Sequence, residues 1–176
     1  MKNSIFNAAI FAAVTVIGMT ALVAVKPASA QTPINPILPV KNTKEISLDG
    51  NFQFDPNNDI SLNVGLGYFL SPQLEVGGQI RYANPDSGDS AYEIIGAVDY
   101  HFPSQSPLLP FVGVFVGYAD PGGSSDTFTS YGVRGGVKYF LNQNVSVNGI
   151  LRYAATDQDN DESQFGLNLG LSVYLR

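Results

Sequence analysis

The chain has 176 residues, carries no cysteine, and is only 14% charged, with a net charge of −6. A soluble domain is typically about 25% charged, so this composition is poor in charge for an ordinary soluble protein. The acidic balance argues against a nucleic-acid partner, and the lack of cysteine excludes disulfides and a lipoprotein attachment site.

Residues 1–30 have the pattern of a secretory signal peptide. Lys2 provides a positive start, a long apolar stretch follows, and residues 28–30 (Ala-Ser-Ala) form a small-residue cleavage site. An N-terminal membrane anchor is the alternative, but Pro27 and the cleavage site argue against it. We therefore expect the chain to be exported.

Residues 31–44 contain three prolines and no amphipathic period, which predicts an extended, proline-rich periplasmic lead-in. Residues 45–176 are a single domain by length. Within this domain, apolar and polar side chains alternate with a period of two, which is a strong strand signal. The alternating segments cover residues 46–54, 60–70, 74–82, 92–102, 111–118, 131–141, 145–153 and 164–175.

One hairpin pattern occurs twice, in residues 68–83 and 139–154, and predicts an antiparallel sheet. The connections also alternate in kind, as they do in up-and-down barrels of outer membranes. We therefore predict an all-β fold, an eight-stranded antiparallel up-and-down transmembrane β-barrel. Nearly uncharged turns at 71–73, 103–108 and 142–144 alternate with Asp-rich connections at 55–59, 84–89, 120–126 and 155–162.

Alternation alone leaves a soluble lipocalin-like ligand-binding barrel open, with the apolar set facing inward. The interior of an eight-stranded barrel is too narrow for so many large apolar side chains, and no charge occurs on the apolar face. Aromatic residues also cluster at both ends of the strands, where interfacial girdles are expected. These are Tyr68, Tyr82, Tyr92, Tyr100, Phe102, Tyr118, Tyr131, Tyr139, Tyr153 and Phe165.

The polar face carries a balanced set of charges that would point into the lumen. Compensated buried charges predict a paired network that fills the lumen, whereas the alternative is a selective pore or gate. Phe111 and Phe115 have the same inward parity and would obstruct the lumen further. The predicted network consists of Asp49, Glu75, Arg81, Glu93, Asp99, Arg134, Lys138 and Arg152.

Asp157, Asp159 and Asp161 have the spacing that opens an EF-hand loop, but Glu162 and Asn168 stand where glycine and the bidentate glutamate belong. They are a weak candidate for a divalent site. His101, the only histidine, has no nucleophile motif to accompany it. We expect neither catalysis nor a cofactor.

The domain resembles the small eight-stranded outer-membrane barrels of the outer membrane protein A transmembrane-domain type. Its last strand resembles the C-terminal assembly signal of that family at Asn168, Gly170, Val173 and Leu175, although it ends in Leu-Arg and not in an aromatic residue. The resemblance implies insertion into an outer membrane, with membrane lipid and the barrel assembly machinery as partners.

The expected function is a structural or surface-interaction role, performed by a monomer in the cell outer membrane. The first alternative is a narrow channel for ions or small solutes, and the second is the soluble ligand-binding barrel.

Overall fold

The computed structural model describes residues 36–55, 60–83, 90–120, 127–157 and 163–176. The signal peptide, the first part of the lead-in and most of the acidic connections, including Asp159 and Asp161, lie outside the described residues. No helix among the described residues is long and apolar enough to cross a membrane.

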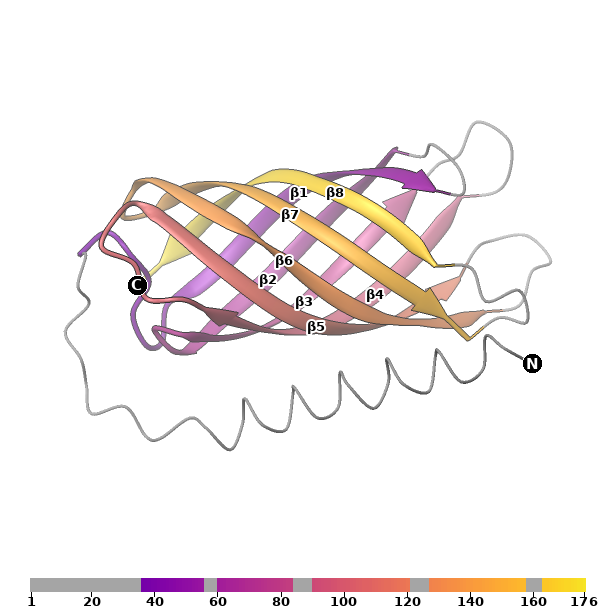
Figure 1. The fold of residues 1–176 in the computed structure, drawn as a ribbon, viewed down its shortest axis with the longest axis horizontal. Helices are drawn as coiled ribbons and strands as arrows, with labels where there is room; N and C mark the ends of the chain where they lie inside the picture. Colours follow the sequence, from indigo (N-terminus) through magenta and orange to yellow (C-terminus); the bar gives the residue numbers. More distant parts are fainter. Residues whose placement is uncertain (1–35, 56–59, 84–89, 121–126, 158–162) are drawn as a thin grey trace. The chain divides into compact units, whose positions relative to one another are not determined.

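The described residues form a closed antiparallel barrel in which each strand pairs with its sequence neighbours and β1 pairs with β8 (Figure 1). Closure leaves no sheet edge exposed. The predicted fold class is confirmed. The strands are β1 (Lys44–Asp55), β2 (Ile60–Ser71), β3 (Leu74–Ala83), β4 (Ala91–His101), β5 (Leu108–Asp120), β6 (Phe128–Asn142), β7 (Val145–Thr156) and β8 (Gln164–Leu175).

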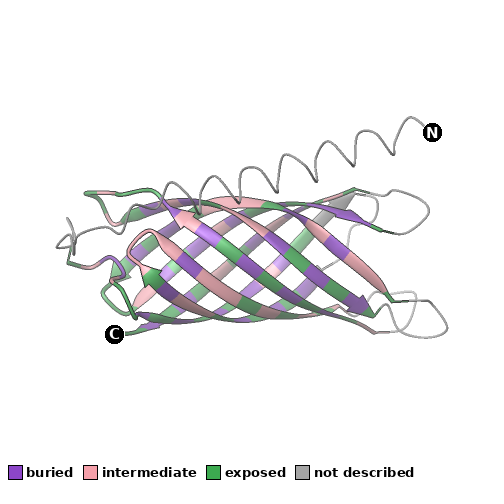
Figure 2. Cartoon of the chain, turned by 90° about the horizontal axis from the view of Figure 1, so that it is seen from below, coloured by how far each residue is buried: buried purple, intermediate pink, exposed green. Residues whose placement is uncertain are grey.

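Burial alternates along the strands, as the banded ribbons in Figure 2 show. On β2, Leu66 is 67% exposed whereas Asn63 is fully buried, and on β4 Ile94 is 66% exposed whereas Asp99 is buried. The polar set therefore faces the lumen and the apolar set faces outward. This arrangement rules out a lipocalin-like barrel with an apolar interior.

The two repeated hairpins turn over two residues, 72–73 and 143–144, one fewer than expected. In each hairpin a register shift next to the turn adds a residue to the preceding strand. The residue after each shift, Ser71 or Asn142, then stabilises the turn with its side chain. The Ser71 hydroxyl accepts from the Gln73 and Leu74 amides, and Asn142 Oδ1 accepts from the Asn144 amide. Short polar side chains commonly stabilise turns in this way.

The described part of the lead-in folds back under the barrel and does not run straight on in an extended form. Residues 36–37 and 41–42 form turns, and Asn42 adopts a left-handed backbone (φ 72°), which asparagine tolerates. The Asn42 amide donates to the Phe69 carbonyl at 2.8 Å, and the Phe69 amide donates to the Thr43 carbonyl at 2.9 Å. These bonds attach the lead-in to the end of β2.

Candidate functional site

The candidate site is the barrel lumen, because the inward side chains of all eight strands meet there. Glycines on the inner face make room for the long charged side chains. A Cβ at Gly113 would lie 2.6 Å from the Val98 carbonyl oxygen and would collide with the Asp99 carboxylate. The alternation of large polar residues and glycine therefore fits the narrow interior of eight strands.

Glu93 on β4 is the centre of a cluster of charged side chains in the lumen, near the end of the barrel that carries the acidic connections. Its carboxylate accepts from Arg81 NH1 at 2.8 Å and from Arg152 NH2 at 2.8 Å, and it also accepts from the Ser130 hydroxyl. Arg152 lies over the Phe115 ring, 4.1 Å from its centroid. Two guanidinium groups from β3 and β7 thus share one carboxylate, which links strands across the lumen.

Arg134 on β6 reaches over Gly113 of β5 to Asp99 on β4. Its Nε donates to Asp99 Oδ1 at 2.8 Å, and NH2 donates to Oδ2 of the same carboxylate. NH1 also donates to Gln79 Oε1 at 3.3 Å. This two-bond geometry is the strong form of an arginine–carboxylate pair.

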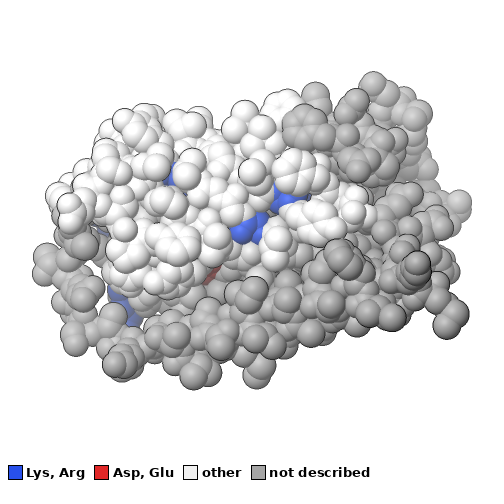
Figure 3. Space-filling view, in the orientation of Figure 1, with Lys and Arg blue, Asp and Glu red and all other residues white. Residues whose placement is uncertain are grey.

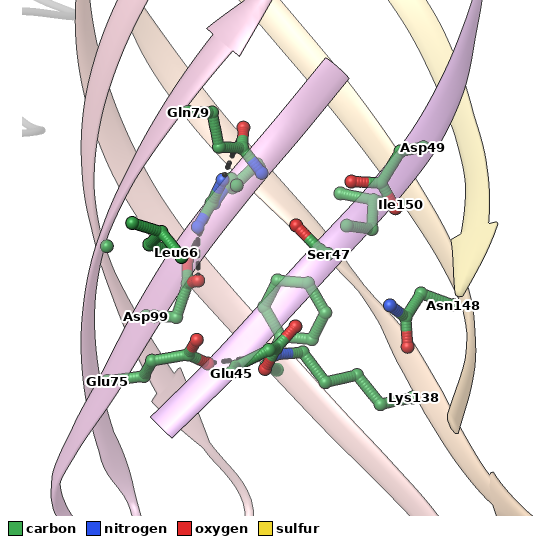
Figure 4. A pocket seen from close by; sticks show the side chains of 15 residues that line it. Glu45, Ser47, Asp49, Leu66, Glu75, Gln79, Asp99, Lys138, Asn148 and Ile150 are labelled. Carbon is green, nitrogen blue, oxygen red and sulfur yellow. Dashed lines mark hydrogen bonds and ion pairs between the residues drawn. The ribbon is translucent and has the colours of Figure 1, made fainter. Parts of the chain in front are cut away.

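Lys138 on β6 is shared between two glutamates in the inner half of the lumen. Its Nζ donates to Glu45 on β1 and, at 2.8 Å, to Glu75 on β3, as Figure 4 shows. The Ser172 hydroxyl donates to Glu45 Oε1 at 2.6 Å, and His101 Nε2 lies 2.9 Å from Glu75 Oε2. Both glutamates are therefore held by several partners.

Below Lys138, aromatic and aliphatic side chains close the inner end of the barrel. Lys138 Nζ lies 5.6 Å from the centroid of the Phe69 ring, within the range of a cation–π contact. The lead-in adds Leu38 to this floor, and Arg176 Nη1 donates to the Pro36 carbonyl at 2.9 Å. The floor cluster consists of Leu38, Phe69, Leu109, Phe140 and Tyr174.

The structure brings seven of the eight residues of the predicted network into ion pairs, and leaves Asp49 out. Asp49 is buried on the inner face, but neither of its carboxylate oxygens has a hydrogen-bond partner of good geometry among the described residues. Arg81 lies opposite Glu93 in the β3–β4 register, and both side chains face inward.

The predicted network did not include Glu45 or His101, and both belong to it. Glu45 has the same odd-numbered parity as Ser47 and Asp49, but β1 was expected to begin only at residue 46, whereas it begins at Lys44. Extending the alternation by two residues would have found it. His101 follows Asp99 on the same inward face of β4 and lies close to it, and its Nε2 contacts Glu75 on the neighbouring strand.

Glu75, Asp99 and His101 are the one described group whose ligand atoms, all within 4.8 Å of one another, could hold a metal ion. Lys138 and Arg134 already bind the two carboxylates, so a metal ion would have to displace or face both cations. Of the weak acidic candidate, only Asp157 is described; it is exposed and accepts from the Thr129 amide at 2.8 Å. The two cations argue against a metal ion at Glu75, Asp99 and His101, and the acidic candidate stays a prediction because Asp159 and Asp161 lie outside the described residues.

His101 has no serine hydroxyl bonded to it in the described chain, and its ring packs between Phe69 and Phe111 at centroid distances of 5.1 and 5.3 Å. General-base catalysis needs a nucleophile within hydrogen-bond reach of the imidazole. This surrounding gives His101 a packing and hydrogen-bonding role in the floor of the lumen.

The predicted girdle residues lie on the outer surface at both ends of the barrel. Three of the tyrosine hydroxyls bond to polar residues next to the strands: Tyr68 donates to Asn42, Tyr118 donates to Thr127, and Tyr82 bonds to Ser90. Tyrosine at a membrane interface has this arrangement, with its ring in the apolar region and its hydroxyl in the polar region. Tyr68, Tyr100 and Tyr131 are half-buried, and the other seven are exposed.

The residues of the predicted assembly signal occupy both faces of β8. Asn168 faces inward and bonds to Asn51, Gly170 lies opposite Asp49, and Val173 and Leu175 face outward. Tyr174 points into the floor of the lumen and is fully buried. The lipid side of the strand end therefore presents aliphatic side chains and no aromatic ring.

The outer surface between the girdles is apolar. In Figure 3 the described atoms of the visible face are almost all white, with few Lys, Arg, Asp or Glu atoms showing. A broad apolar belt with tyrosines at both ends and a polar, filled interior is the arrangement of a transmembrane β-barrel. These features define the class of protein.

The chain belongs to the family described as outer membrane protein beta-barrel domain, whose model matches residues 9–172. No curated protein matches the chain. Among solved structures it is similar to the N-terminal β-barrel domain of OprF from Pseudomonas aeruginosa, at 18% identity and a TM-score of 0.65, over 77% of this chain and 98% of that chain.

Two further solved structures have the same fold. Neisserial surface protein A is 20% identical, with a TM-score of 0.57, over 76% of this chain and 95% of that chain. A de novo designed transmembrane β-barrel is 17% identical, with a TM-score of 0.54, over 78% of this chain and 99% of that chain. Because natural and designed proteins share this fold, the fold by itself assigns no activity.

Proposed function

We propose that this protein is a non-enzymatic structural barrel of the cell outer membrane, with a closed lumen and with acidic connections that serve surface interactions. The observation that carries the proposal is the obstruction of the lumen. Five contacts between Lys or Arg and carboxylates lie within it. Three of them join strands that are three places apart around the barrel, Lys138 to Glu45 and Glu75 and Arg152 to Glu93. The floor of Leu38, Phe69, Leu109, Phe140 and Tyr174 closes its inner end.

Membrane lipid around the apolar belt is the proposed main partner, and the barrel assembly machinery is the proposed partner during insertion. A monomer is proposed because the barrel closes on itself through the β1–β8 pairing and needs no second copy to complete the sheet. Export by cleavage after residue 30 is part of the same proposal. Mass determination of the protein recovered from the outer-membrane fraction tests that cleavage.

Conductance of the refolded protein in a planar bilayer tests the closed lumen. The proposal expects no steady conductance from samples that migrate as folded, detergent-resistant barrels on unheated SDS gels. Regular, reproducible current steps from the same folded samples would support the alternative, a narrow channel for ions or small solutes. A heated, unfolded sample is the control for leakage caused by nonspecific insertion.

A further inference from the structure

A small cavity lies in the lumen, among the charged side chains that surround Arg134 and Lys138. It leaves about 20 Å³ for the centres of water-sized groups, which is room for one or two of them. Figure 4 shows Asp49 on one side of this cavity, apart from the tip of Lys138. The ionisable residues that line the cavity are Glu45, Asp49, Glu75, Asp99, Arg134 and Lys138.

The lining has more negative than positive groups. Four carboxylates face two cations, so two negative charges lack a counter-charge when all six groups are ionised and His101 is neutral. Arg134 is committed to Asp99, and Lys138 is shared by Glu45 and Glu75. Even a protonated His101, which contacts Glu75, would leave one negative charge uncompensated.

One of these two negative charges belongs to Glu45 and Glu75, which share Lys138, and the other is the carboxylate of Asp49. Asp49 is 1% exposed, and neither oxygen has a hydrogen-bond partner of good geometry among the described residues. The Ser47 hydroxyl, two residues earlier on β1, is the neutral polar group that interacts with it.

The two cross-strand neighbours of Asp49 offer no charge, because Gly170 has no side chain and Asn63 is an amide. Asn63 Oδ1 accepts from Arg81 Nε at 3.1 Å, while its Nδ2 also lacks a partner among the described residues.

The other charges of the lumen are tied up in pairs at the outer end. Glu93 is shared by Arg81 and Arg152, and none of the three lines the cavity. The titratable or charged groups that face the lumen are Glu45 and Asp49 on β1, Glu75 and Arg81 on β3, Glu93, Asp99 and His101 on β4, Arg134 and Lys138 on β6, Arg152 on β7, and Tyr174 on β8.

We propose that the cavity beside Asp49 binds one monovalent positive charge from solvent, either a proton or a small alkali cation. An isolated ionised carboxylate in a buried site is costly, and a buried charge is normally paired or neutralised. The bound charge neutralises Asp49 in the folded barrel. In the unfolded chain, water solvates the carboxylate, so the charge is released. The folding equilibrium therefore depends on the concentration of that ion.

Urea unfolding of the refolded wild type and of Asp49→Asn in lipid vesicles tests the proposal. One series varies pH at fixed Na⁺, and the other replaces Na⁺ by choline at fixed pH and ionic strength. The readout is the difference between the two proteins, which removes the contribution of titrating groups that do not interact with Asp49. Asp157→Asn, which removes one exposed carboxylate outside the lumen, is the matched control.

If the ion is a proton, wild type becomes less stable relative to Asp49→Asn as pH rises, by up to about tenfold in the unfolding constant per pH unit. If it is an alkali cation, wild type becomes more stable relative to the variant as Na⁺ replaces choline. The unfolding constant of wild type relative to the variant then falls by up to about tenfold for each tenfold increase in Na⁺ concentration. A difference that is constant across both series overturns the proposal and leaves water alone in the cavity.

Infrared spectroscopy of wild type labelled with carbon-13 aspartate gives an answer that needs no variant. A carboxylic-acid band that shifts with the label at neutral pH identifies a protonated aspartate inside the barrel. Absence of this band, together with no dependence of wild-type stability on Na⁺, overturns the proposal even if Asp49→Asn fails to fold.

Discussion

Loss of the Glu93 charge should destabilise the barrel more than loss of either arginine that binds it. Arg81 and Arg152 each lie 2.8 Å from this carboxylate. The side chain of Arg81 is 12% exposed, that of Arg152 is 9% exposed and that of Glu93 is 8% exposed. Glu93→Gln would leave two guanidinium groups at the outer end of the lumen without a counter-charge. Arg81→Met would leave Glu93 still paired with Arg152.

The expected magnitudes follow from this asymmetry. Removing one partner of a buried ion pair costs about 3–5 kcal/mol, and we expect Glu93→Gln to cost about 3 kcal/mol because its cluster retains some exposure. Arg81→Met should cost only about 1–2 kcal/mol, the loss of a hydrogen bond to a charged group. Adding Arg81→Met to Glu93→Gln should recover stability, because one unpaired guanidinium is left and not two.

Reversible urea unfolding of the refolded proteins measures these differences. Far-ultraviolet circular dichroism is the appropriate signal, since the chain has no tryptophan. Asp157→Asn, an exposed carboxylate outside the lumen, controls for a change of net charge and should alter stability little. Equal costs for Arg81→Met and Glu93→Gln, combined additively in the double variant, would refute the shared-carboxylate reasoning.

Three further predictions concern the outer face, the inner glycines and the floor. Val114→Arg, near the middle of β5 on the lipid side, should cost about 2–4 kcal/mol in vesicles, and Val114→Ala should cost much less; equal costs in urea unfolding would contradict the lipid-facing assignment. Gly113→Ala should destabilise the barrel by about 1–3 kcal/mol through overpacking, whereas Gly96→Ala, whose Cβ would meet nothing within 4 Å, should be tolerated. A lower folded yield of Gly96→Ala than of Gly113→Ala on unheated gels would contradict the inward orientation of Gly113. Leu38→Ala should cost about 2 kcal/mol or more by opening a hole in the floor, and an unchanged urea midpoint would show that the lead-in is not docked.

The strands and their faces were predictable because a period of two fixes the side of every residue once one face is known. The Arg81–Glu93 pairing was predictable for the same reason: the two residues lie at equal distances from the centre of one hairpin. Contacts inside a single hairpin depend only on the turn, which the sequence marks with glycine, proline and polar residues.

Contacts across the lumen could not be predicted in the same way. Lys138 reaches Glu45, which is far away in sequence and lies on a strand that does not neighbour β6. Which distant side chains meet depends on the stagger of all eight strands around the barrel, and alternation does not encode that stagger. For the same reason Asp49 was expected to be paired. The turns in residues 36–43 were not expected, because the prolines of the lead-in favoured an extended form.

The most direct test of the account is a scan of single cysteines along β5, which is feasible because the chain has none of its own. Spin labels at residues 112–116 of the vesicle-bound protein would report contact with lipid-soluble oxygen or with a water-soluble relaxation agent. The account predicts that residues 112, 114 and 116 contact oxygen in the lipid and that residues 113 and 115 are shielded from it. Uniform exposure to the water-soluble agent, or the opposite alternation, would contradict a transmembrane barrel with a filled polar lumen.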